Sequence, residues 1–430
     1  MNPLLILFLF FCYFLLIFLI SHFTSKNATS LDFFNANKSS PWYIVAFGMI
    51  GTSLSGVTFI SVPGEVGNSN FSYFQIVLGY LLGYFVIATI LMPLYYKLNL
   101  VSIYTYLDKR FGFFSYKTGS FFFLLSRIIG SSFRLFLVAS VLQIIFFDSL
   151  NIPFFISVFI TISLIWVYTY KGGIKTIVWT DTLQTFFMLS AVIITILIIM
   201  NEMDLNFSKA KDIIISSAYS DVFIFDWKNE RFFLKQFFSG AFIAIVMTGL
   251  DQDMMQKNLT CKNLSDAQKN IFWFCIVLLF ANILFLTLGA LLYLYADFIQ
   301  MPVPSRTDNL YPLIAINHLS IFGSIIFLLG IIAAAYSSAD SALTSLTTAF
   351  CIDFLNFEKR NDIQKKSVRL KVHLLFSVII FFVIQIFNLI NDESVINAIF
   401  KAAGYTYGPL LGLFSFGILT NYKIIDRYSP

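Results

Sequence analysis

Charged residues are scarce in this sequence. Asp, Glu, Lys and Arg make up only 12% of the 430 residues, about half of the roughly 25% that is usual in a soluble domain. The sequence also has only three histidines and four cysteines, and the cysteines lie far apart without the spacing of metal ligands (Cys12, Cys261, Cys275 and Cys351). We therefore expect neither a disulfide nor a zinc site. No basic patch is present that would indicate nucleic acid as a partner.

Hydrophobic residues, in contrast, make up 58% of the chain, and the mean hydropathy is +0.81. Apolar runs such as 176–200 are longer than the roughly 20 residues that a helix needs to cross the hydrocarbon core of a bilayer. None of these runs shows the period-two alternation that is typical of membrane strands. The sequence therefore predicts an all-α membrane protein with the lipid bilayer as its solvent.

We expect about eleven transmembrane helices. The leading helix, 3–20, has no charged segment before it and no small-residue cleavage site, so we expect it to be retained and not removed as a signal peptide. Ten core helices, which we number one to ten, follow at 42–66, 71–98, 116–147, 153–170, 174–200, 233–256, 270–296, 321–350, 372–389 and 395–419.

The charges between these helices predict the orientation of the chain. With this helix map, nineteen Lys and Arg residues, Lys257 among them, fall in one set of alternate loops, and six fall in the other set. Lys and Arg gather in cytoplasmic loops. We therefore expect the N-terminus outside, the loop 201–232 outside, and the C-terminus in the cytoplasm, as in a multi-pass protein of the cell (inner) membrane.

Core helices one and six are poor sequences for an uninterrupted span. Core helix one contains glycines, a proline and several hydroxyl residues between Gly48 and Gly64, and core helix six contains Gly240, Gly249 and the polar stretch 248–253. Interrupted helices at corresponding positions of two halves indicate an inverted-repeat transporter with a site at the membrane midplane. Two alternatives stay open: close packing through small residues, and water around Asp251 and Asp253 at the inner helix end.

Core helix eight has a small polar face that suits a monovalent cation. Ala334, Ser337, Ser338 and Ser341 follow one another at helical spacing. Hydroxyl and carbonyl oxygens without strong net charge suit sodium, whereas zinc would need His or Cys.

Three further groups of ionisable residues lie within the predicted spans, where such residues are commonly functional. Asp340 belongs to core helix eight and Asp181 to core helix five, where it could also be a solvated charge at the start of the helix. Arg127 and Arg134 are seven apart on core helix three. They could pair with a carboxylate inside the bundle, or they could bind an anionic substrate.

Taken together, these segments resemble the sodium:solute symporter family. The matching stretches run in family order: 51–59 (GTSLSGVTF), 104–112 (YTYLDKRFG), 170–184 (YKGGIKTIVWTDTLQ), 249–252 (GLDQ), 256–259 (QKNL), 267–269 (AQK), 334–344 (AAYSSADSALT) and 404–412 (GYTYGPLLG). The resemblance implies a leucine-transporter-type fold: a leading helix and inner loop (1–40), a first five-helix repeat (41–200), an outer loop (201–232), an inverted second repeat (233–420) and a cytoplasmic tail (421–430).

The resemblance also implies which residues form the sites. The main sodium ion would bind carbonyl oxygens of core helix one and carbonyl and hydroxyl oxygens of core helix eight, which are here those of Gly51, Leu54, Ala334, Ser337 and Ser338. Some members have a second sodium ion beside the aspartate of core helix five. The matching residues here are Asp181, Asp340 and Ser341.

A solute pocket between core helices one, two, three, six and ten is implied in the same way. Its candidate residues are Ser53, Ser55 and Thr58, followed by Gln75, Arg134 and Arg127. Ser55 and Thr58 are similar to the residues at these positions in sialate-transporting members. We therefore take a carboxylated solute as a hypothesis.

The sequence also departs from the family pattern in two respects. Ala244 and Leu278 stand where sugar-transporting members have asparagine and lysine, which argues against a galactose-like solute. Members commonly continue for two or more helices beyond core helix ten, whereas this sequence ends at Pro430. A shortened member and an incomplete chain both fit this difference.

The sequence thus predicts a secondary active symporter that imports a small organic solute with sodium by alternating access, without an obligate protein partner. A proton-coupled transporter of the same fold is the nearest alternative, because Asp181 and Asp340 could titrate. We find no catalytic triad or ligand set that would indicate an enzyme, since His22 and His318 are expected in loops and His373 at a helix start. A channel would need a selectivity filter, and a sensor would need an attached signalling domain.

Overall fold

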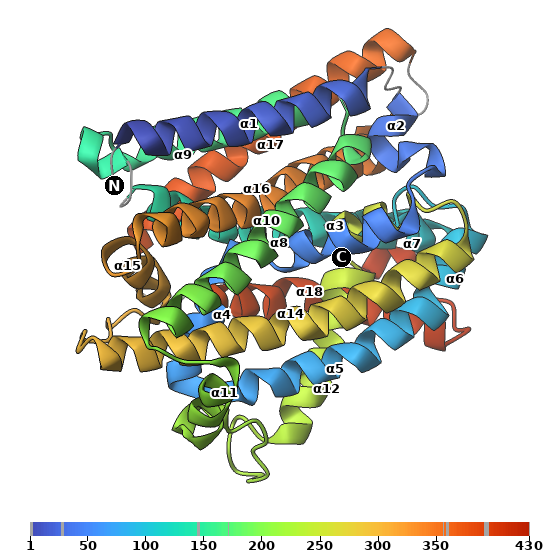
Figure 1. Cartoon of the computed structure of the whole chain (residues 1–430). Helices are drawn as coiled ribbons and strands as arrows, with labels where there is room; N and C mark the ends of the chain where they lie inside the picture. Colours follow the sequence, from blue (N-terminus) through green and yellow to red (C-terminus); the bar gives the residue numbers. More distant parts are fainter. Residues whose placement is uncertain are drawn as a thin grey trace.

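A computed structural model of the chain describes residues 3–26, 30–143, 147–170, 172–355, 357, 361–390 and 395–429. The described part is almost entirely helical, and its long helices lie side by side and run roughly across the view of Figure 1. The helices of the predicted spans are α1 (Pro3–Ser25), α3 (Trp42–Ser53), α4 (Gly56–Ser69), α5 (Tyr73–Val86), α6 (Met92–Lys97), α8 (Phe113–Leu142), α9 (Phe154–Thr169), α10 (Ile174–Glu202), α12 (Phe233–Ala244), α13 (Gln252–Asn258), α14 (Leu264–Phe298), α16 (Ile321–Ala349), α17 (Asp362–Ile390) and α18 (Val395–Leu419).

The prediction of about eleven membrane-spanning helices is confirmed. Within the described residues, eight helical stretches are long and apolar enough to cross a membrane, and the bent pair of α12 and α13 makes a ninth. The stretch Gly56–Lys97 has 42 residues, twice what one crossing needs, and it turns at Asn70, whose φ is 52°. It therefore contributes two crossings, and α3 extends the first of them. The 16-residue apolar helix α9 contributes the one crossing that remains of the predicted eleven.

Several helices are longer than hydrophobicity alone predicts. α14 begins at Leu264 and α17 at Asp362, six and ten residues before the predicted starts, because polar helical turns can extend beyond the hydrocarbon core. For the same reason two predictions about histidines are wrong. His22 lies in α1, not in a loop, and His373 lies inside α17, where its ring is buried between the hydroxyls of Thr169 and Thr347.

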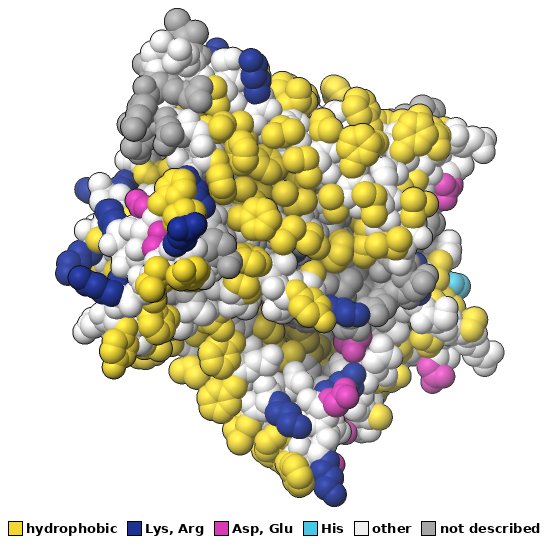
Figure 2. Space-filling model, turned by 180° about the vertical axis from the view of Figure 1, so that it is seen from behind, with side chains coloured by type: hydrophobic (Ala, Val, Ile, Leu, Met, Phe, Trp, Pro, Cys, Tyr) yellow, Lys and Arg dark blue, Asp and Glu magenta, His cyan; other side chains and the backbone are white. Residues whose placement is uncertain are grey.

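Short helices cover both ends of the bundle. In Figure 1, α11 (Phe207–Ser216) and α15 (Leu310–Asn317) lie at the end where α1 begins, and α2 (Ser30–Asn35), α6 and α7 (Thr105–Arg110) lie at the opposite end. Figure 2 shows a broad hydrophobic face, with many Lys and Arg side chains gathered at its left edge, which is the end of α6 and α7. This arrangement is that of a multi-pass membrane protein with its charges at the two membrane surfaces.

Helix α16 forms the centre of the fold. Every residue from Gly330 to Ala349 is buried, and α16 packs against α3, α4, α8, α10 and α17. Its small side chains allow this, because alanine, serine and glycine let neighbouring helices approach closely. The predicted polar face of core helix eight therefore lies inside the bundle.

A second close contact joins α5 to α12. A Cβ atom on Gly79 would lie 2.0 Å from the carbonyl oxygen of Phe237, and one on Gly240 would lie 2.0 Å from that of Ile76. Only glycine fits at either position, so these two helices are held backbone to backbone.

Candidate functional site

Core helix one is broken in the middle, as its composition predicts. α3 ends at Ser53 and α4 begins at Gly56, while Leu54 (φ −87°, ψ 76°) and Ser55 (φ −72°, ψ 178°) leave the helical conformation. A helix end leaves the carbonyl oxygens of its last turn without intrahelical partners. The break therefore presents backbone oxygens, including that of Gly51, in the interior of the bundle.

The break faces the small residues of α16. A Cβ atom on Gly51 would lie 3.0 Å from the hydroxyl oxygen of Ser337, and one on Gly56 would lie 4.0 Å from the backbone of Ala335. Leu54 lies in the chain between these two glycines and is 2% exposed. The two segments predicted for the main sodium site are thus brought together.

The residues at this junction fit a sodium ion. Ala334, Ser337 and Ser338 are all buried. The hydroxyl of Ser338 donates to the carbonyl of Ala335 at 3.1 Å, so its oxygen lone pairs stay available. Buried hydroxyl oxygens beside freed carbonyls are the donor set that suits a monovalent cation.

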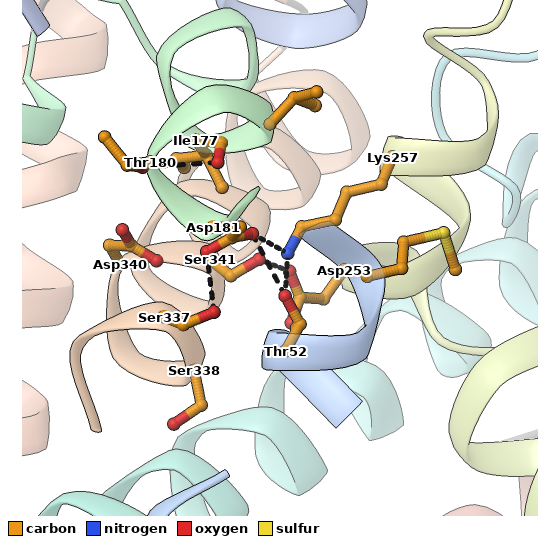
Figure 3. Close-up of polar contacts among 12 residues, drawn as sticks. Thr52, Ile177, Thr180, Asp181, Asp253, Lys257, Ser337, Ser338, Asp340 and Ser341 are labelled. Atoms are coloured by element: carbon orange, nitrogen blue, oxygen red, sulfur yellow. Dashed lines mark hydrogen bonds and ion pairs between the residues drawn. The ribbon is translucent and has the colours of Figure 1, made fainter. Parts of the chain in front are cut away.

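The residues of the possible second sodium site each bind a different partner, and Figure 3 shows those of Asp181. Asp181 accepts hydrogen bonds from Ser337 at 2.7 Å and from Thr52 at 3.0 Å. Asp340 accepts one from Tyr168 at 2.9 Å. Ser341 donates to Asp253 at 2.5 Å. All these groups are buried, so Asp181 is not a solvated charge at a helix start.

Lys257 is the residue that sequence reasoning missed. It was expected in an inner loop, but it lies on α13 with 1% of its side chain exposed. Its ammonium group binds the Asp181 carboxylate, 2.5 Å from Oδ2, and also donates to the Thr52 hydroxyl. The sequence places it in the family-matching stretch 256–259, but its burial depends on the angle at which core helix six breaks.

Core helix six breaks at Leu250 and Asp251, where the helix bends by 69°. Asp251 caps α13 by accepting from the backbone N–H of Asp253 at 2.9 Å. Both aspartates are buried, which excludes the alternative that water surrounds them. Arg127 forms an ion pair with Asp253, and its guanidinium lies 3.8 Å from Asp251.

Hydrogen bonds hold this break closed on the side of α6 and α7. The hydroxyl of Tyr95 donates to the carbonyl of Gly249 at 2.8 Å, and that of Tyr104 donates to Leu250 at 2.9 Å. The side chain of Gln252 binds the backbone N–H of Ile103 at 2.9 Å. The carbonyls that the break frees are therefore occupied at this end.

A cavity with an empty volume of about 740 Å³, including its open part, lies beside the break of core helix one. It is lined by Thr52, Ser53, Ser55, Val57, Thr58, Tyr73, Tyr80, Tyr84, Arg127, Arg134, Ile243, Ala244, Met247, Thr248 and Met254. Five of the six predicted solute residues are among them.

Gln75 is the exception. Its side chain accepts from the backbone N–H of Ile224 at 3.2 Å and donates to the carbonyl of Arg231 at 3.1 Å. It therefore holds the loop between α11 and α12 and is not among the residues that line the cavity.

The two arginines of α8 differ in their partners. Arg127 is 5% exposed and is paired with aspartates. Arg134 is partly exposed and has no ion-pair partner among the described residues. Of the two alternatives for these arginines, pairing inside the bundle holds for Arg127, and Arg134 is the cationic group available to the cavity.

Comparison with known proteins agrees with this geometry. The chain is similar to the sodium/sialic acid symporters NanT of Aliivibrio fischeri (25% identity, covering 92% of this chain and 79% of the relative) and SiaT of Proteus mirabilis (24% identity, 92% and 81%). Its fold matches a solved Na⁺-coupled sialic acid symporter in a substrate-bound outward-open state, with a TM-score of 0.83 and 22% identity over 96% of this chain and 86% of that one.

A more distant structural match is the nucleobase-cation symporter Mhp1, with a TM-score of 0.59 and 14% identity over 90% of this chain and 80% of that one. The fold is thus one leading helix and two inverted five-helix repeats. The model of the sodium:solute symporter family matches residues 33–422, nearly the whole chain, and the chain therefore belongs to that family.

Proposed function

We propose that this chain is a sodium-coupled symporter that imports a small organic solute bearing a carboxylate group. The observation that carries the proposal is Arg134, an arginine in a hydroxyl-lined cavity without a carboxylate partner among the described residues. A guanidinium group binds carboxylate through two parallel hydrogen bonds. A solute carboxylate would thus supply the partner that the described part of the protein does not.

The hydroxyls around the cavity fit a polyhydroxylated or otherwise polar acid. Ser53, Ser55 and Thr58 line the side next to the break, and Tyr80 and Tyr84 line another part. Relatives of this chain are named for sialic acid and for monocarboxylates, and both solute classes carry a carboxylate. We infer that the solute belongs to this chemical class.

Sodium and solute would act on the same broken turn. Gly51 lies beside α16, whereas Ser53 and Ser55 line the cavity. A sodium ion held by carbonyls of this turn and by hydroxyls of Ser337 and Ser338 would fix its conformation. The hydroxyls that receive the solute would then be held in place, and solute affinity would rise with sodium concentration.

The conformation fits loading from the outer side. The cavity reaches Tyr73 at the start of α5, while the other end of the bundle is closed by the bonds of Tyr95, Tyr104 and Gln252. Opening these bonds while the outer side closes would release solute and sodium inward. In the proposed topology of the inner membrane, the N-terminus is outside, the tail 421–430 is cytoplasmic, and the repeats are 41–200 and 233–420.

Uptake into proteoliposomes tests this function. Radiolabelled sialic acid and, in parallel, lactate are offered to vesicles under an imposed sodium gradient, an imposed proton gradient, or neither. We expect accumulation of one of the acids only with inward sodium. Accumulation driven by the proton gradient alone would support the proton-coupled alternative, and uptake independent of both gradients would contradict symport.

A further inference from the structure

Lys257 brings a fixed positive charge to the carboxylate of core helix five. Its ammonium group is buried and binds Asp181 Oδ2 at 2.5 Å and the hydroxyl of Thr52 (Figure 3). α13, which carries Lys257, is buried along all seven of its residues. The ammonium is therefore part of the protein interior and not a surface charge that has folded inward.

The second sodium site implied by the family resemblance does not fit around this lysine. Sodium needs several oxygen lone pairs directed at one point. Here Ser337, Thr52 and Lys257 all point hydrogens at the Asp181 carboxylate. Both of its oxygens are engaged by donors, so a metal ion would have to displace the ammonium group.

Charge leads to the same conclusion. Lys257 interacts electrostatically with Asp340 as well as with Asp181, so one ammonium faces two carboxylates. A sodium ion beside the ammonium group would face a like charge at short range in a medium of low dielectric constant. The remaining predicted ligand, Ser341, is held by a hydrogen bond to Asp253.

We propose that Lys257 is a built-in cation that occupies the position of a second sodium ion, so that this chain binds one sodium ion, at the junction of Gly51 with Ser337 and Ser338. The inference rests on the proposed sodium coupling and adds its stoichiometry. The 69° break makes it possible, because it turns α13 inward and carries Lys257 to α3 and α10.

Equilibrium binding of radioactive sodium to the purified full-length chain, with no solute present, tests the proposal. We expect one sodium ion per wild-type chain and one in Lys257→Arg, which keeps the charge. Lys257→Ala leaves Asp181 and Asp340 without the ammonium group and should bind two. The double variant Lys257→Ala with Asp181→Asn should again bind one sodium ion per chain.

Two sodium ions per wild-type chain would overturn the proposal, whether or not Lys257→Ala folds. A folded Lys257→Ala chain that still binds one ion would also overturn it. These results leave sodium-driven uptake intact and so are distinguishable from failure of the proposed function, whereas a wild-type chain that binds no sodium would contradict both.

Discussion

Arg127 of α8 and Asp253 of α13 form an ion pair in which both side chains are almost completely buried. The pair joins core helix three to α13, the second half of core helix six, next to the solute cavity. Removing one partner of a buried ion pair leaves an uncompensated charge and costs about 3–5 kcal/mol.

We therefore expect Arg127→Met and Asp253→Leu each to lower thermal stability in detergent strongly, because each leaves the other charge unpaired. The double variant should lose clearly less than the sum of the two single losses. Thermal unfolding of the wild type, the two single variants and the double variant measures these losses of stability. Additive losses would show that the pair is not coupled, and Lys269→Met, which removes an exposed ion pair with Asp266, serves as the control.

Arg134 is expected to decide solute affinity. Arg134→Gln removes a charge-assisted hydrogen bond of about 1.5–3 kcal/mol, so KM for a carboxylated solute should rise roughly 10- to 100-fold. The KM of Arg134→Lys should lie between those of the wild type and Arg134→Gln, because lysine keeps the charge and loses the two-pronged geometry. Uptake kinetics measure the change, and unaltered KM in Arg134→Gln would exclude a carboxylate at this position.

Ser337 and Ser338 are expected to decide the sodium dependence. Ser337→Ala combined with Ser338→Ala removes two hydroxyl oxygens from the proposed ion site, and sodium-driven uptake should be lost. Ser345→Ala is a matched control, since Ser345 is buried on the same helix and donates to a carbonyl of its own turn, as Ser338 does. Sodium dependence that survives the double change would place the ion elsewhere.

Gln75 is expected to act on the outer loop and not on the solute. Gln75→Leu removes the acceptor of the Ile224 N–H, so hydrogen exchange of this amide should become faster, while KM changes by less than about threefold. Gln268→Leu, which removes a similar side-chain bond to the carbonyl of Ala88, should leave Ile224 unaffected. A large rise in KM with unchanged exchange would restore Gln75 as a solute ligand.

Asp426 gives a pH-dependent contact outside the membrane. Partial burial opposes its charged form, but hydrogen bonds from the Ser115 side chain and from the backbone N–H groups of Ser115 and Phe114 outweigh burial and lower the pKa of Asp426. A lowered pKa in the folded state means that the contact stabilises the tail above the ordinary carboxyl pKa and is lost as pH falls through the lowered value.

Hydrogen exchange of the Phe114 and Ser115 amides measures this contact. We expect both amides to stay protected at neutral pH and to lose protection under acid conditions, after correction for the intrinsic pH dependence of exchange. Asp426→Asn should show the weaker protection at every pH. Protection that does not depend on pH in the wild-type chain would contradict the assignment.

The sequence was sufficient for the helices, the break of core helix one and the small polar face of core helix eight. A spanning helix must be predominantly apolar over about 20 residues, and the residues between Gly51 and Gly56 favour a break wherever the helix is placed. These features are local, so they can be read along the chain.

The partners of polar side chains were not predictable in the same way. Arg127 and Arg134 are seven residues apart and equivalent in sequence, but among the described residues only Arg127 forms an ion pair with an aspartate, because the break of core helix six places Asp253 there. Lys257 is buried by the same break. The angle of a break is set by tertiary packing, which neither composition nor spacing reveals.

The broken turn of core helix one has a thermodynamic consequence. If ion and solute both act on its few backbone atoms, linkage requires that the factor by which sodium strengthens solute binding equals the factor by which solute strengthens sodium binding. Abundant solute would then compensate for scarce sodium in loading the carrier. A substitution that loosened this turn would weaken both effects together and let either cargo travel alone.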